Sequence, residues 1–200
     1  MYVKFFKRFF DFIFSLIAVV VLSPVLLALI IVGAVAMRGN PFFVQPRPGK
    51  KGKDGQEKIF KLVKFRTMDN RKDKDGNLLP DDVRLNKYGK IMRITSLDEL
   101  PELFNILKGD MSFVGPRPLI SSEIRAHRLR LEYGVYRFRP GLTGWAQING
   151  RDDISLMKKM KLDKEYCDKW SLKLDLIILL RSFGVVVKQK GYQEGAIHRR

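Results

Sequence analysis

Two adjacent carboxylates, Asp98 and Glu99, open a short amphipathic segment near the middle of the chain. Pro101 fits only the first turn of a helix, because proline lacks the N–H and collides with the carbonyl four residues earlier. The pattern therefore predicts a helix that begins near Asp98, with its free N–H groups and positive dipole end around the carboxylates. Such a pair is a candidate catalytic dyad. Apolar residues at three- and four-residue spacing predict the packed face: Leu97, Leu100, Leu103, Phe104 and Leu107.

The same stretch also fits a purely structural role. Ser96 precedes Glu99 by three residues, which is the spacing of a capping box at the start of a helix. Capping boxes are far commoner than carboxylate dyads, so these residues alone favour capping. The surrounding sequence has to decide between the two interpretations.

Four cations are placed where they could bind phosphate near this pair. Lys64 lies in an alternating segment that predicts a strand, and Arg93 ends a basic helical stretch that leads into the carboxylates. A cation near Asp98, together with the positive end of the predicted helix, should depress the pKa of this carboxylate and keep it ionised at neutral pH. Prolines flank Arg117 and a glycine precedes Arg151, so each guanidinium can be aimed by a fixed backbone. For Arg117, a rigid connector with an exposed arginine explains the local sequence equally well.

An apolar segment near the N-terminus is long enough to enter a membrane. Residues 12–37 form 26 positions without a charge, and Ser23-Pro24 divides them into 12 residues before the proline and 13 after it. At about 1.5 Å per residue, neither half crosses about 30 Å of hydrocarbon by itself. Lysines and arginines flank both ends, so the positive-inside rule gives no crossing direction.

We therefore predict a re-entrant helix that is kinked at Ser23 and Pro24 and has both ends on the cytoplasmic face. The main alternative is a single helix that is kinked at the proline but still crosses the membrane, because true transmembrane helices tolerate proline. A cleaved signal peptide is disfavoured, since the apolar run exceeds the usual 7 to 15 residues or so.

The rest of the chain predicts a small β-hairpin and several helices. Gly-rich and polar stretches mark the turns, and residues 69–82 form a surface loop. The last predicted helix is basic and amphipathic, which fits the membrane interface and core packing equally well. The predicted strands are 42–45 and 59–65, the predicted helices are 84–93, 154–170 and 171–188, and the tail 189–200 is predicted to be flexible.

Composition limits the classes of partner. Two hundred residues suffice for one domain with an appendage, and a net charge of +17 calls for an anionic partner such as nucleic acid, anionic lipid or a phosphorylated substrate. The single Cys167 excludes an internal disulfide framework and is best explained as a small buried side chain. The chain contains neither a Gly-rich dinucleotide fingerprint nor the usual phosphate-binding loop of NTPases.

Taken together, these segments resemble the bacterial sugar transferase family, the small monotopic phosphoglycosyl transferases that act on a polyprenol phosphate carrier. The resemblance covers nearly the whole chain except the tail, and seven motifs occur in the right order, which outweighs the capping interpretation. The motifs are Lys7-Arg8 with Asp11, Ser23-Pro24, Gln45-Pro46-Arg47-Pro48-Gly49, Lys64-Phe65-Arg66-Thr67-Met68, Ser96-Leu97-Asp98-Glu99-Leu100-Pro101, Gly115-Pro116-Arg117-Pro118, and Arg139-Pro140-Gly141-Leu142-Thr143-Gly144.

The resemblance implies transfer of a sugar-1-phosphate from a UDP-sugar to polyprenol (undecaprenyl) phosphate, with release of UMP and with Mg²⁺ as cofactor. It implies that Asp98 is the covalent nucleophile and Glu99 its partner, both near the metal, with Lys64, Arg93, Arg117 and Arg151 as substrate-binding residues. Splitting the exchange into two displacements would keep two anionic substrates apart.

The implied fold class is α+β, with a re-entrant membrane helix at residues 1–38, a mainly helical transferase domain at 39–188 that includes the β-hairpin and interfacial amphipathic helices, and the tail at 189–200. The implied location is the cytoplasmic face of the bacterial inner (plasma) membrane, with no nucleic acid partner. The sugar, the pathway and a homo-oligomeric state stay open.

Two departures and two rivals accompany the resemblance. The connector between Gly52 and Phe60 looks longer than the family's hairpin, and no multi-span region precedes the match, so the resemblance is to the minimal form. One rival is a membrane-tethered basic binding protein, which explains the charge but not two arginines held in rigid turns beside a carboxylate pair. The other is a membrane-bound phosphohydrolase, which differs only in its acceptor.

Overall fold

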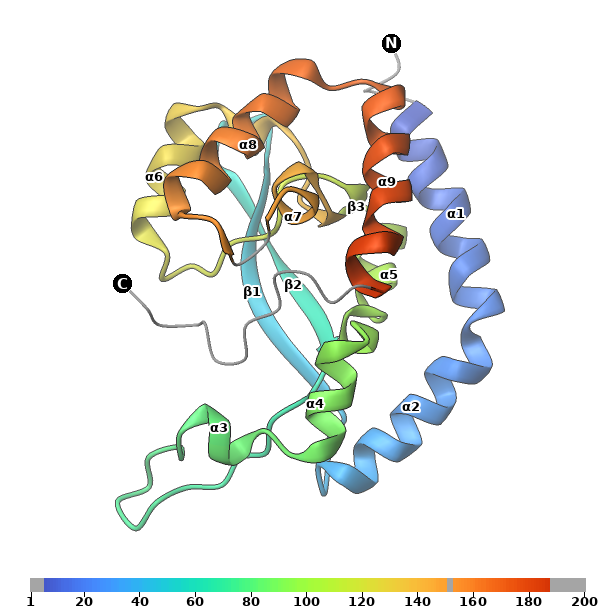
Figure 1. Cartoon of the computed structure of the whole chain (residues 1–200), viewed down its shortest axis with the longest axis vertical. Coiled ribbons are helices and arrows are strands. Elements are labelled where there is room, and N and C mark those ends of the chain that lie inside the picture. The colour runs from blue at the N-terminus through green and yellow to red at the C-terminus, as the bar shows by residue number, and fades with distance from the viewer. Residues whose placement is uncertain (1–5, 151–152, 188–200) are drawn as a thin grey trace.

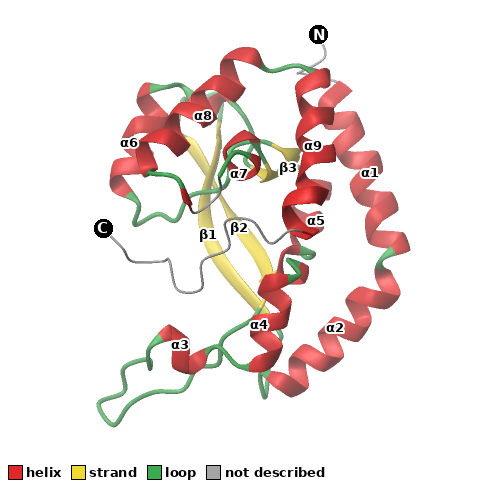
Figure 2. Cartoon of the chain, viewed as in Figure 1, coloured by secondary structure: helices red, strands yellow, loops and turns green. Residues whose placement is uncertain are grey.

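The computed structural model describes residues 6–150 and 153–187. Within these ranges the class is mixed α+β and mostly helical, as predicted (Figures 1 and 2). The helices are α1 (Lys7–Val21), α2 (Ser23–Ala36), α3 (Asp81–Arg84), α4 (Lys87–Ile94), α5 (Glu102–Lys108), α6 (Ile124–Glu132), α7 (Trp145–Ile148), α8 (Leu156–Lys169) and α9 (Leu172–Val187). The strands are β1 (Phe42–Lys51), β2 (Glu57–Phe65), β3 (Ser112–Val114) and β4 (Gly141–Thr143), and 3-10 turns cover Leu97–Glu99 and Val135–Arg137.

The N-terminal apolar segment is bent at the predicted place. Helices α1 and α2 meet at an angle of 64°, and α2 runs along the lower right of Figure 1. Pro24 has no N–H for the carbonyl of Val20, and the hydroxyl of Ser23 donates to that carbonyl instead, over 2.7 Å. In the described ranges, no helix by itself has the length and apolar character to cross a membrane, whereas this bent pair passes the same test together.

Charged residues at the start of α1 tie it to the rest of the protein. Lys7 forms an ion pair of 2.6 Å with Asp175 of α9, and Arg8 donates to two carbonyls in the last turn of α5 over 2.6 and 2.7 Å. Asp11 is buried and accepts hydrogen bonds from a hydroxyl and an N–H of β3. The N-terminal charged motif therefore fixes the first half of the bent pair against α5, β3 and α9.

The predicted hairpin is present, and its strands are longer than predicted. Strands β1 and β2 pair antiparallel from Phe42 opposite Phe65 to Pro48 opposite Ile59, with an irregularity beyond Pro48. Proline is tolerated in β1 because, among the strands that the structure describes, this one pairs with β2 alone and so lies at an edge. Phe60 and Leu62 of β2 pack against α5, which places the hairpin directly beside the segment with the carboxylates.

The helical predictions agree with the structure to different degrees. The basic stretch 84–93 is not one helix: α3 ends at Arg84, and Asn86 caps a separate helix α4 by accepting a hydrogen bond of 2.8 Å from Gly89 N–H. Helix α8 matches the prediction for 154–170 closely. The predicted tail, residues 189–200, lies outside the described ranges.

Helix α9 has one face that packs in the core and another that exposes apolar side chains, and its sequence had been compatible with either role. Ile178 is fully buried in a cluster with Val114 and Tyr166, so one face packs in the core. The opposite face exposes apolar side chains at Leu172, Leu176, Leu180 and Phe183. In Figure 1 this helix lies beside α1, whose own exposed apolar side chains include Phe14, Ile17 and Val20. The core also holds Cys167, which is buried as predicted.

The short parallel pair of β3 and β4 was not predicted. Ser112 pairs with Gly141 and Val114 with Thr143. Gly141 has no side chain to obstruct this pairing, since a Cβ there would lie 2.1 Å from the backbone nitrogen of Gly115. Three residues per strand are too few for a hydrophobic alternation to be visible in the sequence.

Candidate active site

Asp98 and Glu99 lie in a 3-10 turn and not in an α-helix. Ser96 adopts a left-handed conformation with φ of 56°, and the N–H of Glu99 donates to the Ser96 carbonyl over 3.2 Å. Helix α5 begins only at Glu102, with Pro101 just before it, so the predicted helix start at Asp98 is wrong by one turn. The Ser96 side chain makes no capping hydrogen bond, and the capping box is therefore not formed.

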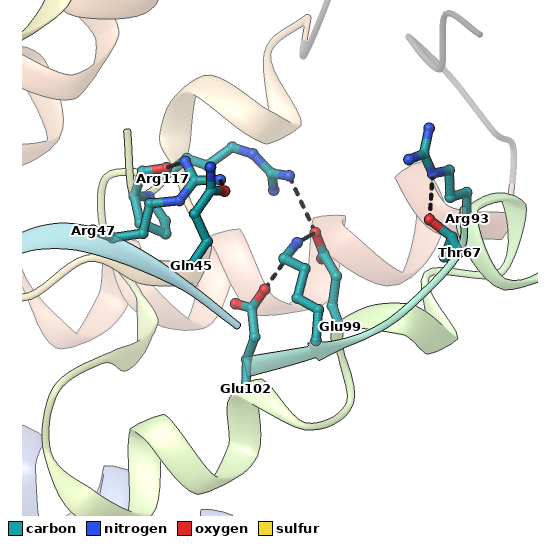
Figure 3. Close-up of polar contacts among 9 residues, drawn as sticks. Gln45, Arg47, Thr67, Arg93, Glu99, Glu102 and Arg117 are labelled. Atoms are coloured by element: carbon teal, nitrogen blue, oxygen red, sulfur yellow. Dashed lines mark hydrogen bonds and ion pairs between the residues drawn. The ribbon is translucent and has the colours of Figure 1, made fainter. Parts of the chain in front are cut away.

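Among the described residues, Lys64 and Arg117 both contact Glu99. The ammonium of Lys64 lies 2.7 Å from its Oε1, and Nη2 of Arg117 lies 3.1 Å from the same oxygen (Figure 3). The Lys64 and Glu99 side chains are only 16% and 15% exposed, whereas Arg117 is 51% exposed. Lys64 and Arg117, two of the predicted substrate-binding residues, thus lie beside the carboxylate pair, and their binding of substrate stays a prediction.

Glu102 completes the cluster, although the sequence interpretation did not include it. Its Oε1 lies 2.9 Å from the Lys64 ammonium, and its side chain is 3% exposed. Burial raises the pKa of Glu102 to about 7, because the loss of water outweighs the attraction of Lys64. Glu102 follows Glu99 by three residues, and this spacing, which puts both on one helical face, is the signal that could have identified it.

Burial and the negative charge of Glu99 raise the pKa of Asp98 to about 6. The positive charges of Lys64, Arg117 and Arg93 lower it by less. The prediction that the nearby cation and the helix end would depress this pKa is therefore wrong. At neutral pH a carboxyl group with a pKa of about 6 is still mostly ionised, and it is a stronger nucleophile than an ordinary aspartate.

Arg93 lies in α4, its positive charge lowers the pKa of Asp98, and its side chain is held by Thr67. Its Nε donates to the hydroxyl of Thr67 over 3.0 Å, and Figure 3 shows this pair set apart from Glu99 and Glu102. Helix α4 can approach Thr67 because Gly89 has no side chain, since a Cβ at Gly89 would lie 1.9 Å from the Thr67 carbonyl oxygen. Arg93 thus contributes charge near Asp98 without a direct contact to Glu99 among the interactions described.

The loop that carries Arg117 is braced from two sides. Arg130 donates to the main-chain carbonyl of Arg117 over 2.7 Å, and Arg47 of β1 donates to the carbonyl of Pro118 over 3.1 Å. Burial, and then the charge of Arg117, lower the pKa of Arg47 to about 10. Arg47 also donates to Gln45 over 2.7 Å, so the hairpin motif supports the predicted arginine. The remaining predicted ligand, Arg151, lies outside the described residues.

The predicted Mg²⁺ site has few protein ligands among the described residues. Among the described residues, no group of three or more His, Cys, Asp or Glu side chains is arranged to hold a metal ion. Asp98 and Glu99 supply two neighbouring carboxylates, and Mg²⁺ commonly binds one or two carboxylates together with substrate phosphates. Within the part of the chain that the structure describes, the donor set therefore fits a metal shared with a substrate and has too few ligands for a site built by these residues alone.

The chain resembles known proteins over almost its entire length. The family described as bacterial sugar transferase matches residues 2–189. An uncharacterized sugar transferase of Bacillus subtilis, EpsL, is 44% identical, with 94% of this chain and 90% of that protein covered. The UDP-glucose:undecaprenyl-phosphate glucose-1-phosphate transferase of Klebsiella pneumoniae is 38% identical, and the undecaprenyl-phosphate galactose phosphotransferase of Salmonella typhimurium is 34% identical. In both comparisons 94% of this chain is covered, and it spans 41% and 42% of those two longer proteins.

Proposed function

Because the chain belongs to the bacterial sugar transferase family, we propose that it transfers a sugar-1-phosphate from a UDP-sugar to undecaprenyl phosphate and releases UMP. The names of two relatives state this type of transfer, one for glucose and one for galactose. Since these names differ in the sugar, the proposal includes no particular sugar. The observation that carries it is the carboxylate pair Asp98 and Glu99, with Lys64 and Arg117 bound to the second carboxylate.

In the first step of the proposed reaction, an oxygen of Asp98 attacks the phosphorus that bears the sugar. A new bond forms between that phosphorus and the carboxylate, and the bond to the bridging oxygen breaks, so UMP leaves with that oxygen. In the second step, a phosphate oxygen of undecaprenyl phosphate attacks the same phosphorus, and the Asp98 carboxylate is released. The two anionic substrates are thus never required at the phosphorus together.

The surrounding charges suit this sequence of steps. Asp98 is ionised at neutral pH and has a raised pKa, which favours attack. Lys64 and Arg117 can turn from Glu99 toward the diphosphate and stabilise the charge that moves onto the departing UMP. Asp98 and Glu99 would hold Mg²⁺ jointly with the diphosphate, and the metal would neutralise charge on the phosphate oxygens.

The lipid acceptor gives a role to the apolar surfaces. We propose that α1 and α2 enter the cytoplasmic leaflet as a re-entrant pair and that the exposed apolar stripe of α9 lies against the same leaflet. A bend of 64° and basic residues at both ends support this arrangement. The dyad would then lie on the cytoplasmic side, close to the phosphate of the carrier.

Release of UMP from purified protein tests the function. The assay would combine UDP-glucose, UDP-galactose or UDP-N-acetylglucosamine with undecaprenyl phosphate in detergent. We expect sustained turnover only when carrier is present, no turnover by Asp98→Asn, and, without carrier, a phosphosugar adduct on Asp98 that mass spectrometry can map. Carrier-independent release of sugar phosphate would identify a phosphohydrolase, and the absence of any UMP would favour a basic binding protein.

A further inference from the structure

The Lys64 ammonium lies between two carboxylates that belong to different structural elements. Glu99, 2.7 Å away, is part of the 3-10 turn, and Glu102, 2.9 Å away, is the first residue of α5. The carboxylates differ in their access to water, since the Glu102 side chain is 3% exposed and that of Glu99 is 15% exposed. Glu99 also binds the half-exposed Arg117, which makes it the more accessible partner of Lys64.

Hydrogen bonds between α5 and β2 set the distance between Glu102 and Lys64. Asn105, one turn after Glu102, donates to the carbonyl of Lys61 over 2.8 Å and accepts from the N–H of Val63 over 3.1 Å. Both contacts join α5 to the part of β2 just before Lys64, and Asn105 is itself buried. The backbone positions of Lys64 and Glu102 are therefore fixed relative to each other.

The positive charge of Lys64 is maintained by its two partners. The Lys64 side chain is only 16% exposed, and the carboxylates of Glu99 and Glu102, 2.7 and 2.9 Å away, compensate its charge. If only Glu99 held the ammonium, an incoming diphosphate would draw it away from its sole partner and leave its position unconstrained. With Glu102 on the buried side, the ammonium can exchange Glu99 for phosphate and stay in place.

We propose that Glu102 is a positioning residue that holds the Lys64 ammonium at the Asp98-Glu99 pair while the donor diphosphate replaces Glu99 as its second partner. The proposal rests on the proposed function for its kinetic consequence, and on the three side chains alone for its structural one. A misplacement of about 1 Å in such a group can cost on the order of 100-fold in rate. Glu102 therefore affects the first chemical step, although it does not touch the substrate.

The kinetic test compares Glu102→Gln with wild type in a single turnover of UDP-sugar without carrier. The assay is run at about pH 8.5, where a carboxyl group with a pKa of about 7 is almost fully ionised, so glutamine keeps the shape of Glu102 and removes its charge. We expect the rate constant of the UMP burst to fall at least tenfold, with the burst amplitude retained. Glu102→Asp, which keeps the charge on a shorter side chain, should recover part of that rate. A merely structural role would lower the amplitude and leave the rate constant unchanged, and this result would overturn the proposal.

A matched control and a second readout separate this proposal from the proposed function. Glu165→Gln removes a surface ion pair of 2.7 Å with Lys169 and should leave the burst unchanged. Acetylation by an N-hydroxysuccinimide ester, mapped by mass spectrometry, needs no turnover. In Glu102→Gln we expect Lys64 to react at least threefold faster, with the exposed Lys61 of the same strand as internal reference. Equal Lys64 reactivity in the two proteins would overturn the proposal even if wild type released no UMP.

Discussion

Arg130 donates a hydrogen bond of 2.7 Å to the main-chain carbonyl of Arg117, and this contact connects a buried ion pair to the candidate active site. The same guanidinium donates twice to Asp163 of α8, over 2.5 and 3.2 Å, and both side chains of the pair are less than 5% exposed. Successive contacts thus connect groups that are distant in sequence: Asp163 holds Arg130, Arg130 holds the loop that carries Arg117, and Arg117 contacts Glu99.

Asp163→Asn should destabilise the fold and weaken substrate binding together. Loss of one partner of a buried ion pair typically costs about 3–5 kcal/mol, because the remaining charge stays buried without compensation. We expect a lower Tm in detergent and a raised KM for the UDP-sugar, since the Arg117 loop loses its brace. Asp168→Asn is the matched control: its pair with Arg137 lies at the surface, so Tm should not change measurably. An unchanged Tm in Asp163→Asn would contradict this account.

The pKa of Asp98 predicts an acid limb in the rate of the first step. Attack requires the ionised carboxylate, and with a pKa of about 6 about half of it is protonated at pH 6. Protonation of Asp98 should therefore make the burst rate fall about tenfold per unit well below pH 6, and protonation of Glu102, whose pKa is about 7, should already lower the rate as the pH falls through that value. The pH dependence of single-turnover UMP release measures this directly. A limb near pH 4, the ordinary range for aspartate, would show that the pKa is not raised.

The same shift gives a stability prediction for Asp98→Asn. Because the folded protein raises the pKa of Asp98 from 3.8 to about 6, it binds the proton more tightly than the unfolded chain does. The stabilisation from this proton is complete below pH 3.8 and is lost as the pH rises through about 6. Asparagine avoids the loss, so the variant should have a higher Tm than wild type at about pH 7.5 and an equal Tm near pH 3.5. A lower Tm of the variant at the higher pH would show that ionised Asp98 stabilises the fold.

The local features of this site could be predicted from the sequence, and its charge balance could not. Lys64, Arg117 and the carboxylate pair were identified from residue type, fixed turns and the order of motifs. Glu102 was missed because its role depends on which β2 residue faces the first turn of α5, and that register is set by Asn105 contacts between distant segments.

The direction of the Asp98 pKa shift also could not be predicted from the sequence. Sequence places a cation and a helix start near the carboxylate, and both effects lower a pKa. The helix starts one turn later than predicted, and burial together with the charge of Glu99 outweighs the cations. Desolvation depends on how segments from all parts of the chain enclose a group, which no local pattern states.

Arg117→Lys tests whether the shape of the guanidinium matters beyond its charge. Arginine offers several donors in a planar fork, and lysine offers a single ammonium on a shorter reach. We expect a several-fold rise in KM for the UDP-sugar with the fold intact, because an ammonium cannot reproduce the planar, bidentate contact of a guanidinium with phosphate oxygens. Arg137→Lys, at a comparably exposed position far from the dyad in sequence, serves as control. Normal turnover and an unchanged KM in Arg117→Lys would make Arg117 a structural residue.

The re-entrant arrangement predicts that both ends of the apolar segment are reached from the same side of the membrane. The 64° bend, the hydroxyl of Ser23 bound to the carbonyl left open by Pro24, and the basic residues at both ends all favour a return to the cytoplasmic face. Single cysteines at positions 2 and 40 can be labelled with a membrane-impermeant maleimide in inverted and right-side-out vesicles. Cys167 does not interfere, because burial raises the pKa of its thiol to about 12 and leaves almost no thiolate to react. We expect both positions to label in inverted vesicles only. Labelling of the two positions from opposite sides would show that the segment spans the membrane, and the dyad would then have to be placed from position 40 alone.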